Sequence, residues 1–461
     1  MMTKQSISIF SGAIELNSRS LENFRDFIDR LSSDNDVWKF EEYTLADDDR
    51  VRLQSLYYDS LIDSIYPSEE LRMSSGICKS TRQWSVDINR EVKLQSSDDG
   101  VAIFVKRLRY LLFSSDLLLF SIEIDNAGKN LNEITKIGSI ISAPNRYSVQ
   151  KLSNEFYRLF LPLIYMQQVS PLDIFDGESL GDDEVANIFR KLLKGNKLYT
   201  YSVIQLEEGA VGQYYNDNTL YEIGNHFPIG VTSDCEHNCF PDEGYKQKIL
   251  CDNKIACFDN WRALALNDVV CMLAKPSVPG HALNSWMGNY FDLIYINAFY
   301  LKCYLAHVNK KYQRIDVDDT IYRQFVEFDK IFNLHKISYN FLPQMIYDKL
   351  CYAFDLSNEW HELQEKITRY NDDMEREHQK QELELQKQEI AQDKRLSKCV
   401  LFLSCLTIFS ALSDGMGAAD YISEICTQGL DAIGYVRLAI IVVVLVVAVY
   451  VFIELYPRKK K

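Results

Sequence analysis

The sequence predicts an α/β domain followed by a long stalk helix and a hairpin of two transmembrane helices. Three observations lead to this prediction. Short β-rich runs alternate with helical patterns in the first part of the chain, and residues 356–398 contain neither proline nor glycine. Two apolar runs then follow close to the end of the sequence. Interleaved strands and helices are typical of α/β sheets, and a long apolar run is typical of a membrane span.

Residues 1–284 are expected to form the α/β domain, because strand and helix patterns interleave along them. We interpret residues 285–355 as a helical part of the same domain. The apolar stretch 289–307 carries Asp292 and Lys302, which favour a core helix over a further membrane span. The expected strands are 6–16, 101–110, 117–124, 198–206 and a β-rich region at 255–264, and the expected helices include 152–168 and 182–193.

The charge and the N-terminus limit the functions that this domain can have. The chain of 461 residues carries a formal net charge of -15, which argues against a nucleic acid as its main partner. Such a charge suits cations, or simply keeps the protein soluble. The N-terminus lacks the apolar run of a signal peptide, so we expect the domain to stay in the cytosol with its 11 cysteines as free thiols.

Residues 356–398 are expected to form a stalk helix. Joined to the first span, this helix would be about 85 Å long at roughly 1.5 Å per residue. Two interpretations remain open: a coiled coil that holds subunits together, and a lever that carries a change from the domain to the membrane. A heptad pattern of apolar side chains marks its first half, made of Leu356, Trp360, Leu363, Ile367, Tyr370 and Met374.

The two apolar runs are interpreted as transmembrane helices at 399–413 and 435–456, joined by an outer loop at 414–434. Residues 438–453 are apolar without a break, and their flanks complete the roughly 20 residues that span a bilayer. Bases precede the first span, the tail 457–461 is basic, and the loop is acidic. By the positive-inside rule we expect a multi-pass protein of the inner (plasma) membrane with both termini cytosolic.

Four cysteines lie close together in the sequence around one histidine. Cys235 and Cys239 flank His237, and Cys251 and Cys257 follow. Four sulfurs can hold a structural zinc ion, but these spacings differ from the usual two-residue gaps, so free thiols are the favoured interpretation. The sequence shows no Walker phosphate loop, nucleophile elbow or His-Glu-x-x-His motif, and we therefore expect no enzymatic activity.

The C-terminal part of the chain resembles the CorA family of two-transmembrane divalent-cation channels. That family carries a Gly-Met-Asn motif at the outer end of its first span, where this chain has Gly415, Met416 and Gly417. The resemblance covers roughly the last hundred residues and upstream is only architectural. It implies a homopentamer in the lipid bilayer and magnesium as a cargo. In the family the asparagine amides hold a hydrated magnesium ion, which Gly417 cannot do.

One face of the first span carries polar side chains. Ser397, Ser404, Thr407 and Asp414 are spaced by seven, three and seven residues, so they share a helix face. We predict that they line a pore in which Asp414 favours cations; the alternative is that small residues only let helices pack closely. Three bases, Lys394, Arg395 and Lys398, are predicted to ring the inner mouth of the pore, unless they only fix the topology.

Three functions from different classes remain. The favoured hypothesis is a ligand-gated membrane effector, because some CorA-like proteins of type III CRISPR systems respond to a nucleotide second messenger, a SAM-AMP conjugate, and damage the membrane. The alternative is a magnesium or divalent-cation transporter, and the third is an anchored scaffold without a pore. No ligand-binding residue can be identified, and the bases that cluster are Arg107, Arg109, Lys191 and Lys194.

Overall fold

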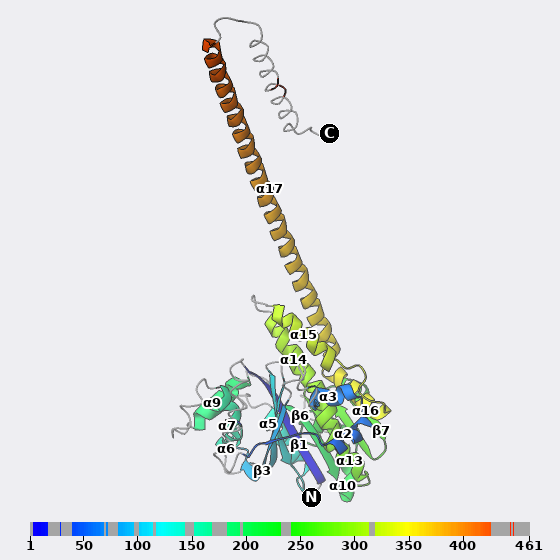
Figure 1. Ribbon diagram of the computed structural model, residues 1–461. Coiled ribbons are helices and arrows are strands. Elements are labelled where there is room, and N and C mark those ends of the chain that lie inside the picture. Colours follow the sequence, from blue (N-terminus) through cyan, green and yellow to red (C-terminus); the bar gives the residue numbers. More distant parts are fainter. Residues whose placement is uncertain are drawn as a thin grey trace. The chain divides into compact units, whose positions relative to one another are not determined.

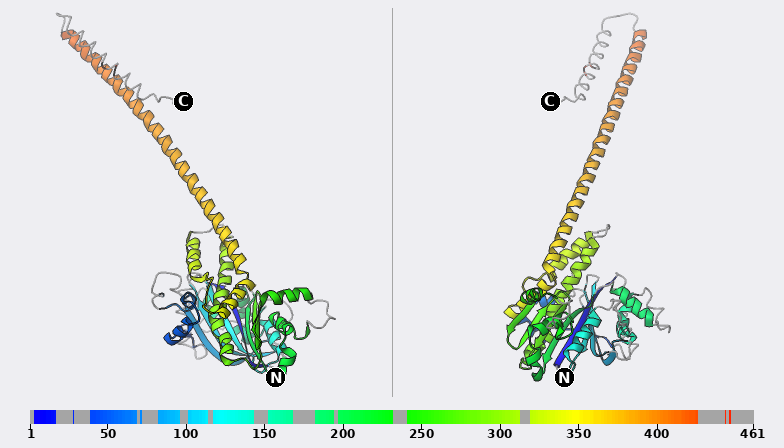
Figure 2. Two further views of the ribbon diagram at one scale, coloured as in Figure 1. Left: turned by 90° about the vertical axis from the view of Figure 1, so that its right-hand side faces the viewer. Right: turned by 180° about the vertical axis from the view of Figure 1, so that it is seen from behind.

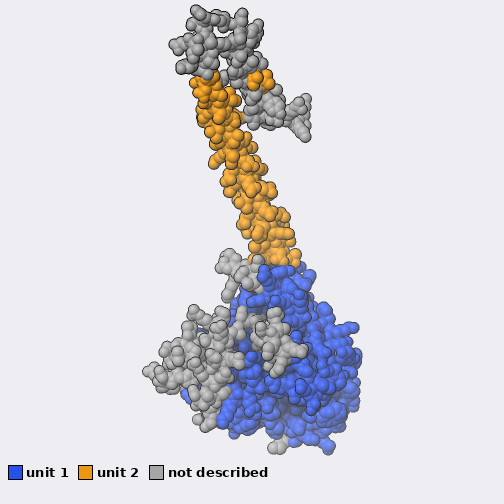
Figure 3. Space-filling view, in the orientation of Figure 1, with its two compact units in different colours: residues 1–367 blue, residues 368–461 orange. Residues whose placement is uncertain are grey.

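The chain divides into two compact units, Met1–Ile367 and Thr368–Lys461 (Figure 3). The first unit is an α/β domain, and the second contains most of a 70-residue helix, α17 (Leu356–Ile425). The computed structural model describes residues 3–16, 28, 39–68, 71, 82–95, 101–113, 117–142, 152–167, 182–193, 197–231, 241–312, 319–425, 443 and 446.

Within the described residues, nine strands form a single sheet in the order β2-β3-β4-β5-β1-β6-β9-β8-β7 (Figure 1). β1 lies at its centre and runs antiparallel to both neighbours, whereas β6 and β9 are parallel. The strands are β1 (Thr3–Glu15), β2 (Glu41–Glu42), β3 (Arg82–Lys93), β4 (Ala102–Leu112), β5 (Leu117–Asp125), β6 (Tyr199–Leu206), β7 (Lys254–Phe258), β8 (Trp261–Ala265) and β9 (Val269–Ala274).

Helices cover both faces of the sheet (Figure 2). α5 (Leu131–Ser142), α6 (Asn154–Arg158), α7 (Leu161–Gln167), α9 (Asp182–Leu192), α10 (Glu208–Tyr214) and α11 (Asp217–Gly224) pack on one face. The other face meets α3 (Asp59–Ile65), α13 (Gly280–Met287), the π-helix η3 (Tyr290–Tyr295), α14 (Ile296–Tyr312), α15 (Asp319–Phe332), α16 (Phe341–Ala353) and the first turns of α17. The helices α2 (Asp47–Gln54) and α12 (Glu243–Asn253) also belong to the domain.

The side chains of β1 alternate between the two faces of the sheet, so this one strand contributes to two hydrophobic cores. Ile9 belongs to the core under η3 and α14, and its neighbour Phe10 belongs to the core under α6 and α9. Successive side chains of a strand point to opposite faces, so this central strand contributes to both cores. At Gly12 there is no room for a side chain, since a Cβ there would lie 2.4 Å from the Phe120 ring.

The strands expected from the sequence correspond to β1, β4, β5, β6 and the pair β7–β8. β3 and β9 were not expected. β3 has mixed burial and a polar sequence, RQWSVDINREVK, which hides the strand pattern. The stretch 289–307 lies in the core as expected, because Phe291, Tyr295 and Tyr300 are buried.

The first turns of α17 belong to the core of the α/β domain. Leu356, Leu363 and Ile367 are buried there, and Trp360 packs against Phe325 with ring centroids 5.1 Å apart. The first four positions of the heptad pattern therefore pack within the chain itself. A coiled coil beyond Ile367 stays a prediction.

His226 occupies a strained, enclosed position at the end of α11. Its φ of 54° lies in the left-handed region, and a Cβ on Gly138 would come within 2.3 Å of its Nδ1. Its Nε2 lies 3.2 Å from the Thr200 hydroxyl. Burial lowers the pKa of His226 to about 4, because the charged imidazolium would lose its hydration.

The low pKa of His226 predicts a loss of stability in mild acid. A histidine whose pKa falls on folding contributes its full stability above about pH 6.5, and this is lost as the pH falls toward 4. The free energy of unfolding should drop by up to about 3 kcal/mol from this group. His226→Asn, which tolerates the positive φ, should show a smaller drop between pH 7 and pH 4 in thermal unfolding. Identical pH profiles for the two proteins would contradict this assignment.

Candidate functional site

Helix α17 is long and apolar enough to cross a membrane. Its portion Leu356–Gly415 contains an 18-residue window of mean hydropathy 1.8, and none of that window is buried. Leu401, Phe402 and Leu403 are among its exposed side chains. A continuous apolar surface of this kind is stable only against lipid or other apolar helices.

The second predicted span, at 435–456, lies outside the described residues except for Val443 and Val446, which are helical and exposed. The basic tail 457–461 also lies outside them. Of the loop expected at 414–434, the described part is helical, because α17 continues to Ile425. This continuation contains no proline, and although Gly415 and Gly417 each disfavour a helix by about 1 kcal/mol, the residues after them include good helix formers such as alanine.

The predicted pore face lies on α17. Ser404 donates a hydrogen bond to the Val400 carbonyl at 2.8 Å, and Thr407 donates one to the Ser404 carbonyl at 2.8 Å. Hydroxyls that bond their own helix can lie in an apolar environment without a further partner. Ser397 and Asp414 are exposed on the same helix. The close-packing interpretation therefore stays open for the hydroxyls, while Asp414 is the side chain that favours a polar surrounding.

The residues that flank this face are also on α17. Lys394, Arg395 and Lys398 are exposed where the apolar part of the helix begins. Gly415, Met416 and Gly417 continue the helix, and among the described residues no atom lies within 4 Å of a Cβ placed on Gly415. Packing against the described part of the chain thus gives no reason for a glycine at position 415.

Only some of the residues around the predicted zinc site are among the described residues. Cys235, His237 and Cys239 lie outside the described residues, while Cys251 on α12 and Cys257 on β7 are free and exposed. The Cys257 thiol lies 3.5 Å from the Met345 sulfur. Within the part of the chain that the structure describes, no three His, Cys, Asp or Glu side chains come together around a metal position. The zinc site remains a prediction.

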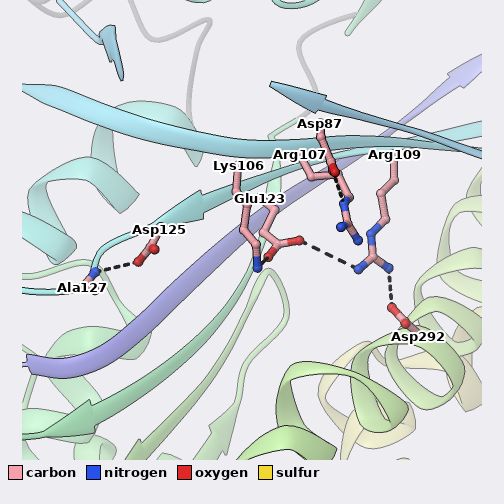
Figure 4. A network of polar contacts seen from close by, with 8 residues as sticks. All are labelled: Asp87, Lys106, Arg107, Arg109, Glu123, Asp125, Ala127 and Asp292. Atoms are coloured by element: carbon pink, nitrogen blue, oxygen red, sulfur yellow. Dashed lines mark hydrogen bonds and ion pairs between the residues drawn. The ribbon is translucent and has the colours of Figure 1, made fainter. Parts of the chain in front are cut away.

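Two of the clustered bases, Arg107 and Arg109, belong to a group of ion pairs on the sheet face that packs against η3 (Figure 4). Arg109 Nη1 lies 2.5 Å from Asp292 Oδ1, and its Nη2 lies 3.8 Å from Glu123 Oε2. Arg107 bonds Asp87 at 2.7 Å. Lys106, which lies at a register shift between β4 and β5, reaches Glu123 at 2.9 Å. These bases are therefore engaged by carboxylates rather than free to bind an anion; Lys191 is exposed, and Lys194 lies outside the described residues.

Burial makes the Arg109 pair an anchor between the sheet and the helical layer. The Arg109 side chain is 10% exposed and its guanidinium lies over the Phe291 ring. Burial alone would lower the pKa of Arg109, but Asp292 and Glu123 outweigh it and raise that pKa. For Asp292, burial raises the pKa while Arg109 opposes the rise. A buried charge that loses its partner is strongly destabilising, so η3 is held where Arg109 places it.

The junction of α14, α16 and α17 contains a second buried cation. Lys302 Nζ donates to the Phe354 carbonyl at 2.6 Å and to Glu359 Oε1 at 2.7 Å. The other oxygen of Glu359 is buried and has no hydrogen-bond partner among the described residues. The sequence offered one signal, a lysine inside a very apolar helix, but it did not indicate the partner, which lies 57 residues further on.

No protein-family model matches the chain, and comparisons with curated proteins and with solved structures give no match either. The fold and α17 define an α/β domain that carries a helix able to cross a membrane.

The burial of Arg109 predicts unequal effects for two neighbouring arginines. Arg109→Met leaves Asp292 and Glu123 without their buried cation and should lower the free energy of unfolding by about 3 kcal/mol. Arg107→Met removes a largely exposed pair and should cost about 1 kcal/mol or less. Denaturant unfolding of the full chain in detergent measures both. Equal losses would show that the Arg109 pair is not an anchor.

Proposed function

We propose that this chain is a CorA-like subunit of a homo-oligomeric membrane channel that a cytosolic ligand gates. The observation that carries the proposal is the continuity of α17. It begins among buried core residues of the α/β domain and runs without a break into an exposed apolar stretch. At roughly 1.5 Å per residue it is about 105 Å long. A change at its first turn therefore has a continuous helix along which to travel.

Several copies are needed to form a pore. Packed helices lie only about 8–10 Å apart, so two spans cannot enclose a water column. Leu383 and Ile390 are exposed and precede Ser397 and Ser404 at seven-residue intervals on α17. A second copy packed along this face would cover the apolar side chains and bring the hydroxyls to the axis. The resemblance to CorA implies five copies, a second span at 435–456 and cytosolic termini in the inner membrane.

Gating by a ligand explains two features together. Gly417 replaces the asparagine on which magnesium selectivity depends in the CorA family. The α/β domain is large and holds the first turns of α17 in its core. A channel that opens only in response to a ligand needs a ligand-binding domain, but it does not need a motif that selects one ion. We therefore favour a nucleotide second messenger such as SAM-AMP as the ligand. The channel would then act in type III CRISPR antiviral defence.

Magnesium or divalent-cation transport is the second candidate. The net charge of -15, Asp414 and the retained Gly415-Met416 pair favour it. A transporter conducts magnesium selectively without a nucleotide, whereas the proposed effector conducts unselectively and only with one.

Ion flux from proteoliposomes tests the channel. The full chain is reconstituted into vesicles that contain magnesium or potassium. These vesicles should release either ion only after a SAM-AMP conjugate is added. Asp414→Asn should reduce cation flux about threefold or more by removing a ring of carboxylates. Thr407→Leu should reduce it further by narrowing the pore. Ser413→Leu, on the opposite side of the helix, is the matched control and should conduct normally.

Each other outcome has a definite meaning. Magnesium-selective flux without nucleotide would support the transporter and exclude the gated effector. Flux that is unchanged by both Asp414→Asn and Thr407→Leu would contradict the assigned pore face. A complete lack of flux with every ligand would leave the scaffold as the remaining function.

A further inference from the structure

A cavity of about 480 Å³ opens in the α/β domain beside α14. Its walls come from the end of β1, the start of β6, the turn between β8 and β9, and one side of α14. This volume is within the range of roughly 300–1,000 Å³ that small-molecule sites occupy. The polar residues that line it include Glu15, Lys197, Asp268, Lys302, His307 and Lys310.

His307 is the first sign that the cavity is built for a ligand. Its side chain is 6% exposed, and Nδ1 lies 3.0 Å from Glu15 Oε1. Neither ring nitrogen makes a hydrogen bond of acceptable geometry within the described residues. Nδ1 still faces the Glu15 carboxylate, so Nε2 is the ring nitrogen without a partner among the described residues. A buried polar atom without a partner costs stability, and a bound ligand or a water molecule is one way to satisfy it.

The charges around the cavity favour an anion. Three lysines and two carboxylates line it, and because Lys302 is already bonded to Glu359, Lys197 and Lys310 are the lysines available to a ligand. Lys197 and Lys310 have exposed ammonium groups whose carboxylate neighbours lie 3.1 and 3.9 Å away. Exposed pairs of this kind are weak, so either lysine can turn to a phosphate or carboxylate at little cost.

An aromatic wall adds an apolar surface. Tyr199 lines the cavity and is half-buried, while the ring of Phe299 behind it, with its centroid 4.8 Å away, is buried. The accessible part of Tyr199 is an apolar surface against which a planar base can pack, while the lysines accept its phosphate. The combination matches a molecule with an aromatic body and an anionic group, which is the chemistry of a nucleotide.

The cavity also reaches the first turn of α17 through Lys302. This lysine lines the cavity and at the same time bonds Glu359 Oε1 at 2.7 Å. An anion beside Lys302 competes with Glu359 for the same ammonium. Because the second oxygen of Glu359 is already buried without a partner in the described structure, weakening this pair frees a carboxylate to move toward solvent.

We propose that this cavity binds an anionic, nucleotide-sized ligand through Lys197, Lys310 and His307. Binding of the ligand then weakens the Lys302–Glu359 pair and so affects the first turn of α17. The binding site stands on the geometry of the cavity alone, whereas the coupling to the membrane rests on the proposed function.

Binding to the purified full chain in detergent tests the site by calorimetry. The probes are AMP, ATP and a SAM-AMP conjugate, with adenosine as the uncharged comparison. At least one anionic probe should bind, and at least about tenfold more tightly than adenosine. Lys310→Met should weaken this binding about tenfold, and Ala306→Phe should abolish it by filling the cavity from an exposed position.

Lys248→Met, which removes an exposed lysine on α12 away from the cavity, is the matched control and should bind as the wild type does. Failure of all three anionic probes to bind the wild type would overturn the proposal. Equal binding by Lys310→Met, Ala306→Phe and Lys248→Met would also overturn it.

The coupling between ligand binding and ion flux through Glu359 needs a separate measurement. Glu359→Gln weakens the competitor for Lys302, so the anionic probe should bind at least as tightly, while flux should need several-fold less of it. Binding without any flux would keep the cavity assignment and remove the gated channel. Nucleotide-gated flux that Ala306→Phe leaves unchanged would keep the channel and place its ligand elsewhere.

Discussion

The bond between Lys302 and Glu359 fixes where the long helix begins. Lys302 holds the carbonyl that ends α16 and the carboxylate in the first turn of α17 at once. Asp355 lies between the two helices with a φ of 57°, and its carbonyl accepts a bond from the Glu359 amide. A buried ammonium needs its partners, so the connection between α16 and α17 has little freedom.

The helical stretch that contains Lys302 is also held by the Arg109–Asp292 pair. η3 and α14 follow one another directly, so Asp292 anchors this stretch near its start and Lys302 anchors it near its middle. One anchor faces the sheet and the other faces the first turn of α17. The cavity lies along the side of α14, at the end of β1 and the start of β6, and Lys302 is one of the residues that line it. A π-helix next to these anchors is consistent with a functional segment, since such helices are frequent at functional sites.

The sequence predicted those features that depend on local patterns. Strands such as β5 are continuous apolar runs, and the apolar stretch of α17 is recognisable from composition alone. β3 was missed because its polar residues do not alternate cleanly. The heptad pattern from Leu356 to Ile367 was detected, but a pattern cannot tell whether its apolar face packs on a partner or on the chain's own core.

The site could be predicted only in part. Asp292 and Lys302 were recognised as unusual in an apolar helix, yet their partners come from β4 and α17, far away in the sequence. The sequence shows Arg107 and Arg109 only as clustered bases, because sequence distance does not reveal pairing across a sheet. The cavity combines residues from several separate elements, and no local motif marks it.

Interrupting α17 between the α/β domain and its apolar stretch shows whether the helix carries the proposed signal. Glu382 lies in an exposed part of the helix, and proline there breaks the helix at a cost of about 3 kcal/mol. Ligand-dependent flux would be measured in proteoliposomes for Glu382→Pro and for Glu382→Ala as the helical control. The account predicts that both variants insert into the membrane and bind ligand, and that only Glu382→Ala retains gating. Equal gating by the two variants would contradict a signal carried along α17.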